Sequence, residues 1–171
     1  MNADPRKSFA AFLRPEAAGD HHAIRSLNEA AFGRPDEANL VDQLRCDGDS
    51  LLSLVAEVDR KIAGHILFSR MWVENVAAVA LAPMSVIPEF QNRGIGSQLI
   101  RRGLDELRER GERIVIVLGH QHYYPRFGFS THLARNLQSP FPPEAYMALE
   151  LSPGALDGVH GKVRYPAAFG L

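Results

Sequence analysis

The feature that most constrains the fold is a strand, a glycine-containing turn and a helix in direct succession. An apolar segment and a polar turn, residues 78–94, precede a helical pattern that begins at Ile95. Gly94 and Gly96 let the backbone approach a ligand closely, and the free N–H groups of the helix N-terminus point outward. The helix dipole and Arg93 favour an anion at the same place, so we expect a phosphate or pyrophosphate there.

Two well-known phosphate-binding motifs do not match this turn. The dinucleotide fingerprint requires a third glycine where Leu99 stands, and the P-loop requires Gly-Lys-Ser/Thr where the chain has Leu99-Ile100-Arg101. A glycine pair between a strand and a helix is also common turn chemistry. Spacing alone therefore leaves phosphate binding and a simple turn as alternatives.

The flanking residues form a longer pattern. It reads Val86-x-Pro88-x-x-Gln91-x-x-Gly94-x-Gly96 and resembles motif A of the GNAT superfamily of N-acetyltransferases, V-x-P-x-x-[QR]-x-x-G-x-[GA]. Downstream, Tyr124-Pro125-Arg126-Phe127-Gly128-Phe129 resembles the Y-x-x-x-G-F of that family. Segments 146–149, 156–159 and 163–166 further resemble a bacterial branch of uncharacterised predicted acetyltransferases. The resemblance implies a GNAT-like α/β fold, in which helices flank a mixed, strongly twisted central sheet in a single domain.

Composition agrees with one globular domain. The 171 residues are 46% apolar, which is sufficient for a single core. Nineteen basic and twenty acidic residues give a net charge of −1, so we expect neither nucleic acid nor a membrane as a partner. One cysteine, Cys46, interpreted as a packing thiol, and the lack of a long apolar run indicate a cytoplasmic protein.

The hydrophobic patterns predict three helices and six strands. The helices are expected at 21–32, 35–45 and 95–110, and the strands at 9–14, 51–58, 62–73, 77–86, 114–118 and 145–151. Pro83 should introduce a bulge or a splayed edge into its strand. The uninterrupted apolar run 114–118 suits a central strand parallel to the strand before the helix, which places the glycine turn at a carboxyl end of the sheet.

The domain organisation expected from these patterns has three parts. A loose N-terminus occupies residues 1–8, the N-acetyltransferase domain residues 9–152, and a C-terminal extension residues 153–171. The extension has few regular patterns and is expected to pack on the domain as a coil.

The resemblance implies that acetyl-CoA is the cosubstrate and assigns its contacts. The strand before the turn would run along the acetyl and pantetheine groups, and the turn would hold the pyrophosphate. The cofactor-binding residues so assigned are Met84, Ser85, Val86, Gln91, Asn92, Arg93, Gly94, Ile95, Gly96 and Ser97.

Acetyl transfer to an amine also needs proton chemistry. Tyr124 matches the family tyrosine that acts as general acid, and a phenol is protonated at neutral pH; the alternative is a packed aromatic ring. The family's strand glutamate is replaced, since the matching positions Ala78, Ala80 and Ala82 are alanines. The remaining candidates for a base are Glu57 acting through a water, His120 and, less strongly, His122, or bulk water alone.

A metal site is not expected. His120-x-His122, with His132 nearby, has no cysteine partner and no carboxylate close in sequence. The chemistry indicated is therefore metal-free.

These observations predict an acyltransferase that moves the acetyl group of acetyl-CoA to a primary amine of a small molecule or peptide by direct attack in a ternary complex, as a monomer or homodimer. Glu29, Asp36, Glu37 and Glu144 against Arg34 alone would favour a cationic acceptor. The alternative is a non-catalytic module of the same fold that binds acyl-CoA as a sensor or structural ligand.

Overall fold

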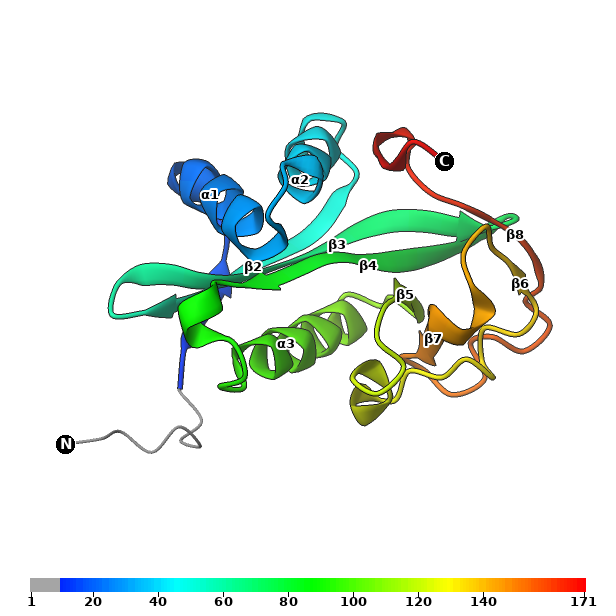
Figure 1. The fold of residues 1–171 in the computed structure, drawn as a ribbon. Helices are drawn as coiled ribbons and strands as arrows, with labels where there is room; N and C mark the ends of the chain where they lie inside the picture. Colours follow the sequence, from blue (N-terminus) through cyan, green and yellow to red (C-terminus); the bar gives the residue numbers. More distant parts are fainter. Residues whose placement is uncertain (1–9) are drawn as a thin grey trace.

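The computed structural model describes residues 10–171 and consists of a mixed sheet with helices on both faces (Figure 1). The strands are β1 (Phe12–Pro15), β2 (Ser50–Val58), β3 (Lys61–Val73), β4 (Val76–Val86), β5 (Ile114–Leu118), β6 (Leu137–Gln138), β7 (Tyr146–Glu150) and β8 (Gly161–Arg164). The helices are α1 (His21–Phe32), α2 (Asp36–Cys46) and α3 (Ile95–Glu109). The loose N-terminus expected at residues 1–8, and Phe9, lie outside the described residues.

The sheet has the strand order β1-β2-β3-β4-β5-β7, and its pairs are antiparallel except for β4 and β5. Helix α3 connects these two parallel strands, as the apolar run at 114–118 predicted. Its apolar side packs on one face of the sheet, whereas α1 and α2 cover the other face (Figure 1). The predicted α/β class, a mixed central sheet flanked by helices, is thereby confirmed.

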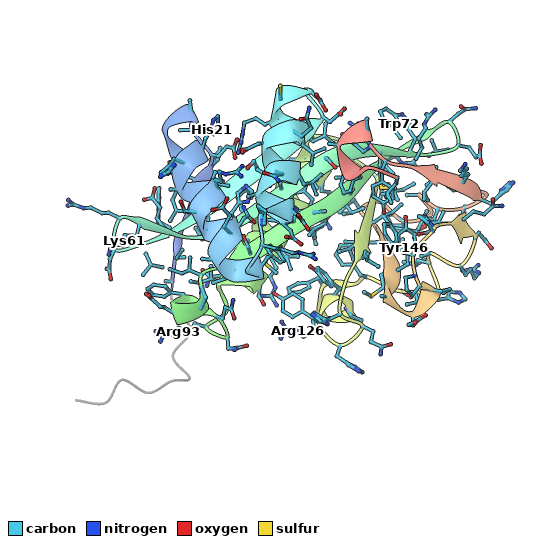
Figure 2. The ribbon with its side chains drawn as sticks, turned by 45° about the horizontal axis from the view of Figure 1, so that its top comes forward. His21, Lys61, Trp72, Arg93, Arg126 and Tyr146 are labelled. Atoms are coloured by element: carbon cyan, nitrogen blue, oxygen red, sulfur yellow. The ribbon has the colours of Figure 1, made fainter. Side chains whose placement is uncertain are left out.

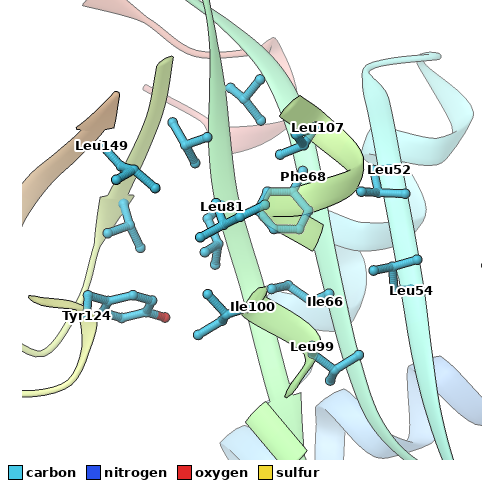
Figure 3. Close-up of a cluster of buried hydrophobic side chains, with 14 of the residues drawn as sticks. Leu52, Leu54, Ile66, Phe68, Leu81, Leu99, Ile100, Leu107, Tyr124 and Leu149 are labelled. Carbon is cyan, nitrogen blue, oxygen red and sulfur yellow. The ribbon is translucent and has the colours of Figure 1, made fainter. Parts of the chain in front are cut away.

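The main core lies between α3 and the sheet (Figure 3). Phe68 and Leu107 are fully buried there, and Gly103 of α3 lies so close to the Phe68 ring that an added Cβ would come within 2.3 Å of it. This close packing fixes the height of α3 over the sheet, and with it the position of the turn from which the helix starts.

The parallel ladder between β4 and β5 is short. It pairs Val79 with Val115 and ends at Leu81 and Val117, although β4 continues to Val86. Just beyond that point Ile66 lies opposite Met84 and Phe68 opposite Leu81, so β4 has one more residue than β3 at Pro83. The bulge predicted at Pro83 is confirmed. The β5-facing edge of β4 therefore has no strand partner after Leu81 among residues 10–171.

The C-terminal extension differs from the expected coil. Its residues 161–164 form β8, which pairs with β3 through Val73 and Val163 and with the short strand β6. Glu74 strengthens this contact, since its carboxylate accepts the Lys162 N–H at 2.6 Å. The 3₁₀ turn at Ala167–Phe169 then contacts α2. The extension is thus brought to the same face of the sheet as α1 and α2. No helix among residues 10–171 is both long and apolar enough to cross a lipid bilayer.

Candidate active site

A cleft of about 910 Å³ opens where β4 and β5 separate. Ala80 and Ile116 line it and belong to the core beneath the C-terminal segments, while Leu81 and Tyr124 line it and belong to the core beneath α3. Neighbouring residues of a strand point to opposite faces of a sheet. The lining of the cleft therefore includes residues from both faces of the sheet.

The glycine turn forms the α3 side of the cleft. Gln91 Nε2 donates to the Val86 carbonyl at 2.9 Å and so fixes the turn to the end of β4. Asn92 and Gly94 adopt positive φ values of 60° and 84°, a conformation for which asparagine and glycine are suited. Gly94 is the N-cap residue of α3 and provides no side-chain cap, so the N–H groups of the first helical turn remain available to an anion.

Gly96 allows two other side chains to reach the start of α3. A Cβ at this position would lie 2.9 Å from the Tyr123 hydroxyl oxygen and 3.1 Å from Met84 Sδ. All three residues line the cleft. The small residue at position 96 therefore sets the width of the cleft beside the helix N-terminus.

Arg126 supplies a positive charge at the same place. Its guanidinium lies 4.5 Å from the centre of the Tyr123 ring and donates to Ser97 Oγ at 3.2 Å, and Arg126 lines the cleft. The sequence analysis did not assign it a role, although it lies within the second motif. Arg93, which was assigned one, does not line the cleft and lies over the Phe90 ring at 5.5 Å. Figure 2 shows Arg93 and Arg126 along one side of the molecule.

Tyr124 closes the inner end of the cleft and is 8% exposed. Its ring stands edge to face with Tyr123 and Phe129, and it packs so tightly on Gly119 that a Cβ there would come within 2.2 Å. Burial raises the pKa of the phenol well above its ordinary value, and Tyr123 acts in the same direction. No group among residues 10–171 hydrogen-bonds the hydroxyl, which is therefore a protonated donor available to a ligand.

The candidate bases lie in different places. His120 is exposed and lines the cleft just after β5, whereas His122 is exposed and does not line it. Glu57 also lies outside the lining, because its place opposite Ile62 puts it at the far end of the β2–β3 hairpin. There its carboxylate accepts a hydrogen bond from Arg14 Nε at 2.7 Å. His120 and Tyr124 thus line the same cleft, whereas Glu57 lies outside it. No three His, Cys, Asp or Glu side chains of the described chain are grouped to hold a metal ion.

The other side of the cleft is mostly apolar. It is lined by Ala31, Phe32, Glu37, Leu40, Ala82, Leu118, Phe141, Tyr165 and Phe169. The one carboxylate, Glu37, is bound by Arg34 Nη2 at 2.5 Å, and the hydroxyl of Tyr165 is bonded to that of Tyr146 at 3.0 Å. Phe141, Tyr165 and Phe169 were not among the predicted site residues, because they belong to segments with no periodic pattern.

The acids expected to attract a cationic acceptor do not gather in the cleft. Glu29, Asp36 and Glu144 are absent from its lining, and Glu29 pairs instead with Arg25 of its own helix at 3.1 Å. Of the four, Glu37 alone reaches this wall, and Arg34 compensates its charge. The expected acidity is therefore much weaker at the site than in the sequence.

The geometry can be compared with known proteins. Residues 21–129 match the family model described as acetyltransferase (GNAT) family. The chain is 41% identical over 137 residues to the uncharacterized N-acetyltransferase YjhQ of Escherichia coli K12, covering 75% of this chain and 76% of YjhQ. It is 35% identical over 162 residues to the uncharacterized N-acetyltransferase YhbS of the same organism, covering 92% of this chain and 97% of YhbS.

Solved structures show the same relationship. The crystal structure of E. coli YhbS in complex with CoA has a TM-score of 0.89 at 34% identity and covers 100% of this chain and 97% of that one. A GNAT family acetyltransferase from Brucella melitensis in complex with acetyl-CoA has a TM-score of 0.80 at 36% identity, covering 94% and 98%. The range matched by the family includes the glycine turn, α3 and both sequence motifs. The chain belongs to the acetyltransferase (GNAT) family.

Proposed function

We propose that this protein transfers the acetyl group of acetyl-CoA to a primary amine of a small molecule or peptide. The observation that carries the proposal is the cleft between β4 and β5, which joins the uncapped N-terminus of α3 to the buried phenol of Tyr124. CoA or acetyl-CoA is bound in two relatives that cover almost the whole chain, which supports the same ligand here.

The donor would bind on the α3 side. Backbone N–H groups of residues 94–97 and the guanidinium of Arg126 suit the pyrophosphate. The edge of β4 left unpaired after Leu81 suits the amide groups of the pantetheine arm, which can pair with Met84 and Val86 as a short added strand. The thioester would then lie beside Tyr124.

The acceptor would enter from the opposite face. Its amine attacks the thioester carbonyl carbon, a C–N bond forms, the C–S bond breaks, and Tyr124 gives its proton to the departing thiolate. The proton lost by the amine passes to water or to His120, which lines the cleft. Because Phe32, Phe141 and Phe169 wall the entrance, we infer that the amine is carried on an apolar or aromatic body.

An assay of free CoA release with a panel of amines tests the proposal. The panel should include phenethylamine, a dipeptide with N-terminal phenylalanine, spermidine and an aminoglycoside. We expect turnover with the first two and little with the polycations, since Glu37 is already compensated by Arg34.

The second candidate function is a non-catalytic acyl-CoA-binding module. It is favoured by the alanines at positions 78, 80 and 82, which leave β4 without a carboxylate. Tight binding of acetyl-CoA, with no CoA release above the buffer rate for any amine, would decide for this module and against transfer.

A further inference from the structure

A chain of hydrogen-bonded polar side chains runs across strands β4, β3 and β2 on the face of the sheet that α1 covers, from the cleft to Glu16 just after β1. Its members are Ser85 on β4, Asn28 on α1, His65 on β3, Ser53 on β2, and Glu16. Asn28 and His65 are 0% exposed and Ser85 is 4% exposed, yet Ser85 lines the cleft. Four of these side chains are buried and Glu16 is half-buried; burying polar groups in contact is costly unless each is satisfied, so their arrangement has to be specific.

The hydrogen bonds of this chain all have the same direction. Asn28 Nδ2 donates to the Ile24 carbonyl at 3.0 Å, which identifies the donor end of the amide. Asn28 Oδ1 then accepts the Ser85 hydroxyl at 2.9 Å, and Nδ2 faces His65 Nδ1 at 3.4 Å, so Nδ1 is the acceptor. The ring hydrogen of His65 is therefore on Nε2.

The far half of the chain continues this direction. His65 Nε2 lies 2.8 Å from Ser53 Oγ, and the Ser53 hydroxyl donates to Glu16 Oε2 at 2.5 Å. Every donor therefore points away from the cleft. At the cleft end, the hydrogen of Ser85 Oγ is committed to Asn28, and the oxygen lone pairs remain for a ligand.

At the end far from the cleft, this series of hydrogen bonds terminates at the carboxylate of Glu16, which stays ionised. Burial would raise the pKa of Glu16, but its contacts with His65, Arg45 and Ser53 outweigh burial and hold the pKa well below its usual range. Arg45 binds both carboxylate oxygens, at 2.8 Å and 3.1 Å. Burial lowers the pKa of His65 more than Glu16 raises it, so the ring is neutral. His21 Nε2, 3.5 Å from Glu16, also faces this end, and Asp20 interacts electrostatically with Glu16.

We propose that Ser85 Oγ accepts a hydrogen bond from the acceptor's amine nitrogen, and that the chain ending at Glu16 positions and polarises this oxygen. The proposal rests on the proposed function. Ser85 lies opposite His65 in the β3–β4 register, on the face that α1 covers, and α1 also contributes to the acceptor wall. An N–H bonded to Ser85 leaves the nitrogen lone pair free to attack the thioester.

Ser85 is not assigned the proton of the amine. Its own hydrogen already points into the chain, and the amide of Asn28 does not pass protons on. In this arrangement Asn28, His65 and Ser53 are positioning residues, and the amine loses its proton elsewhere in the cleft. The chain thus substitutes for the orienting role, rather than the basic role, of a carboxylate on β4.

The first experiment compares Ser85→Ala with a matched control. Ser69→Ala removes another fully buried serine, whose hydroxyl has no hydrogen-bond partner in the described part of the chain and which does not line the cleft. We expect Ser85→Ala to lower kcat/KM for the amine by about 10-fold, the usual effect of one hydrogen bond, with the Kd for acetyl-CoA unchanged. Equal values in the two variants would overturn the proposal.

The second experiment separates positioning from folding. His65→Gln keeps one acceptor and one donor for Asn28 and Ser53, whereas His65→Leu keeps neither. We expect glutamine to retain amine affinity and leucine to lose it as Ser85→Ala does. Loss of amine affinity in both variants, or in neither, would contradict the proposal that these hydrogen bonds position Ser85.

A third measurement does not require turnover. Titration of phenethylamine into the complex with CoA gives the Kd of the amine directly, and Ser85→Ala should raise it about 10-fold. A null assay of CoA release in the wild type, with this shift present, would refute acetyl transfer while retaining Ser85 as the amine site. An unchanged Kd would refute the inference while transfer could still be observed.

Discussion

The surroundings of Tyr124 determine both the position of its ring and the protonation of its hydroxyl. Its ring is fixed between Gly119, Tyr123 and Phe129, and its hydroxyl meets the cleft without a protein partner in the described chain. Because burial raises its pKa, the phenol does not ionise near neutral pH. A packing role and the proposed role as proton donor are therefore compatible in the same residue.

Replacement of Tyr124 by phenylalanine tests this role. The variant keeps the ring and its packing and removes only the hydroxyl. We expect kcat to fall by about 100-fold, a typical contribution of general acid catalysis, with the Kd for acetyl-CoA unchanged. Steady-state rates and equilibrium titration measure the two quantities. Full activity would leave Tyr124 with a packing role alone.

Individual residues also show which parts of the site could be predicted from the sequence and which could not. Met84, Gln91 and the glycines could be placed beside the cleft because the motif specifies a local turn, and local geometry follows from neighbouring residues. Glu57 could not be placed, since its position depends on the register of a hairpin and on Arg14. The buried chain from Ser85 to Glu16 could not be predicted either, because β2, β3, β4 and α1 meet there only in the folded protein.

At the start of α3, side-chain size determines how much room the cleft has beside the helix N-terminus. A valine at position 96 would bring its Cβ within 2.9 Å of the Tyr123 hydroxyl and add further methyl groups to the cleft. We expect Gly96→Val to fold but to lose measurable acetyl-CoA binding. Gly19→Val is the matched control, since nothing lies within 4 Å of a Cβ there.

The readout for this pair is thermal stabilisation by acetyl-CoA. At about 100 times Kd, a ligand that binds only the folded state stabilises it by about 2.7 kcal/mol. Gly19→Val should show the wild-type shift in Tm and Gly96→Val should show none. A wild-type shift in Tm for Gly96→Val would mean that the pyrophosphate does not bind at this turn.

The C-terminal extension, residues 153–171 (the tail), is the part of the structure that could be predicted least well from the sequence. The residues of α1 and β5 were predicted within their observed bounds, because each has a continuous apolar pattern. In contrast, β8 has four residues and pairs with Trp72 and Val73, far away in the sequence, so no local pattern indicates it. The position of Phe169 at the cleft follows from this distant pairing.

Phe169→Ala tests whether the tail contributes to the acceptor wall. Phe169 lines the cleft and lies 4.9 Å from the Tyr165 ring centre. We expect KM for an aromatic amine to rise severalfold, since apolar contact area is lost, while the Kd for acetyl-CoA stays the same. Phe12→Ala, at a phenylalanine that is 65% exposed on β1, is the control and should change neither constant. Equal KM values in both variants would exclude the tail from the acceptor site.

The molecule as a whole should lose stability in weak acid. The folded-state pKa of His65 is lowered from 6.5, and that of Glu16 is lowered from 4.5. In both cases the unfolded chain takes up a proton before the folded one does, so stability is complete above pH 6.5 and falls as the pH decreases. The loss should begin near pH 6.5 through His65 and steepen below pH 4.5 through Glu16.

Urea unfolding between pH 7.5 and 5 measures this dependence. One group that binds a proton only when unfolded contributes a slope of about 1.4 kcal/mol per pH unit. His65→Gln lacks the titrating ring and should show a smaller slope over this range. Identical slopes in the two proteins would mean that His65 is protonated in the folded state.

The α3 side of the cleft and the C-terminal part of its opposite wall are encoded in separable lengths of the chain. The family match ends at Phe129, after the whole donor side has been specified, whereas Phe141, Tyr165 and Phe169 follow it. Substitutions after position 129 can therefore alter which acceptor amine binds, while the residues proposed to bind acetyl-CoA stay unchanged. A hybrid of residues 1–129 with the corresponding tail of a relative should keep acetyl-CoA binding and change the preference among acceptors, while Phe32 and Glu37 of the original wall remain.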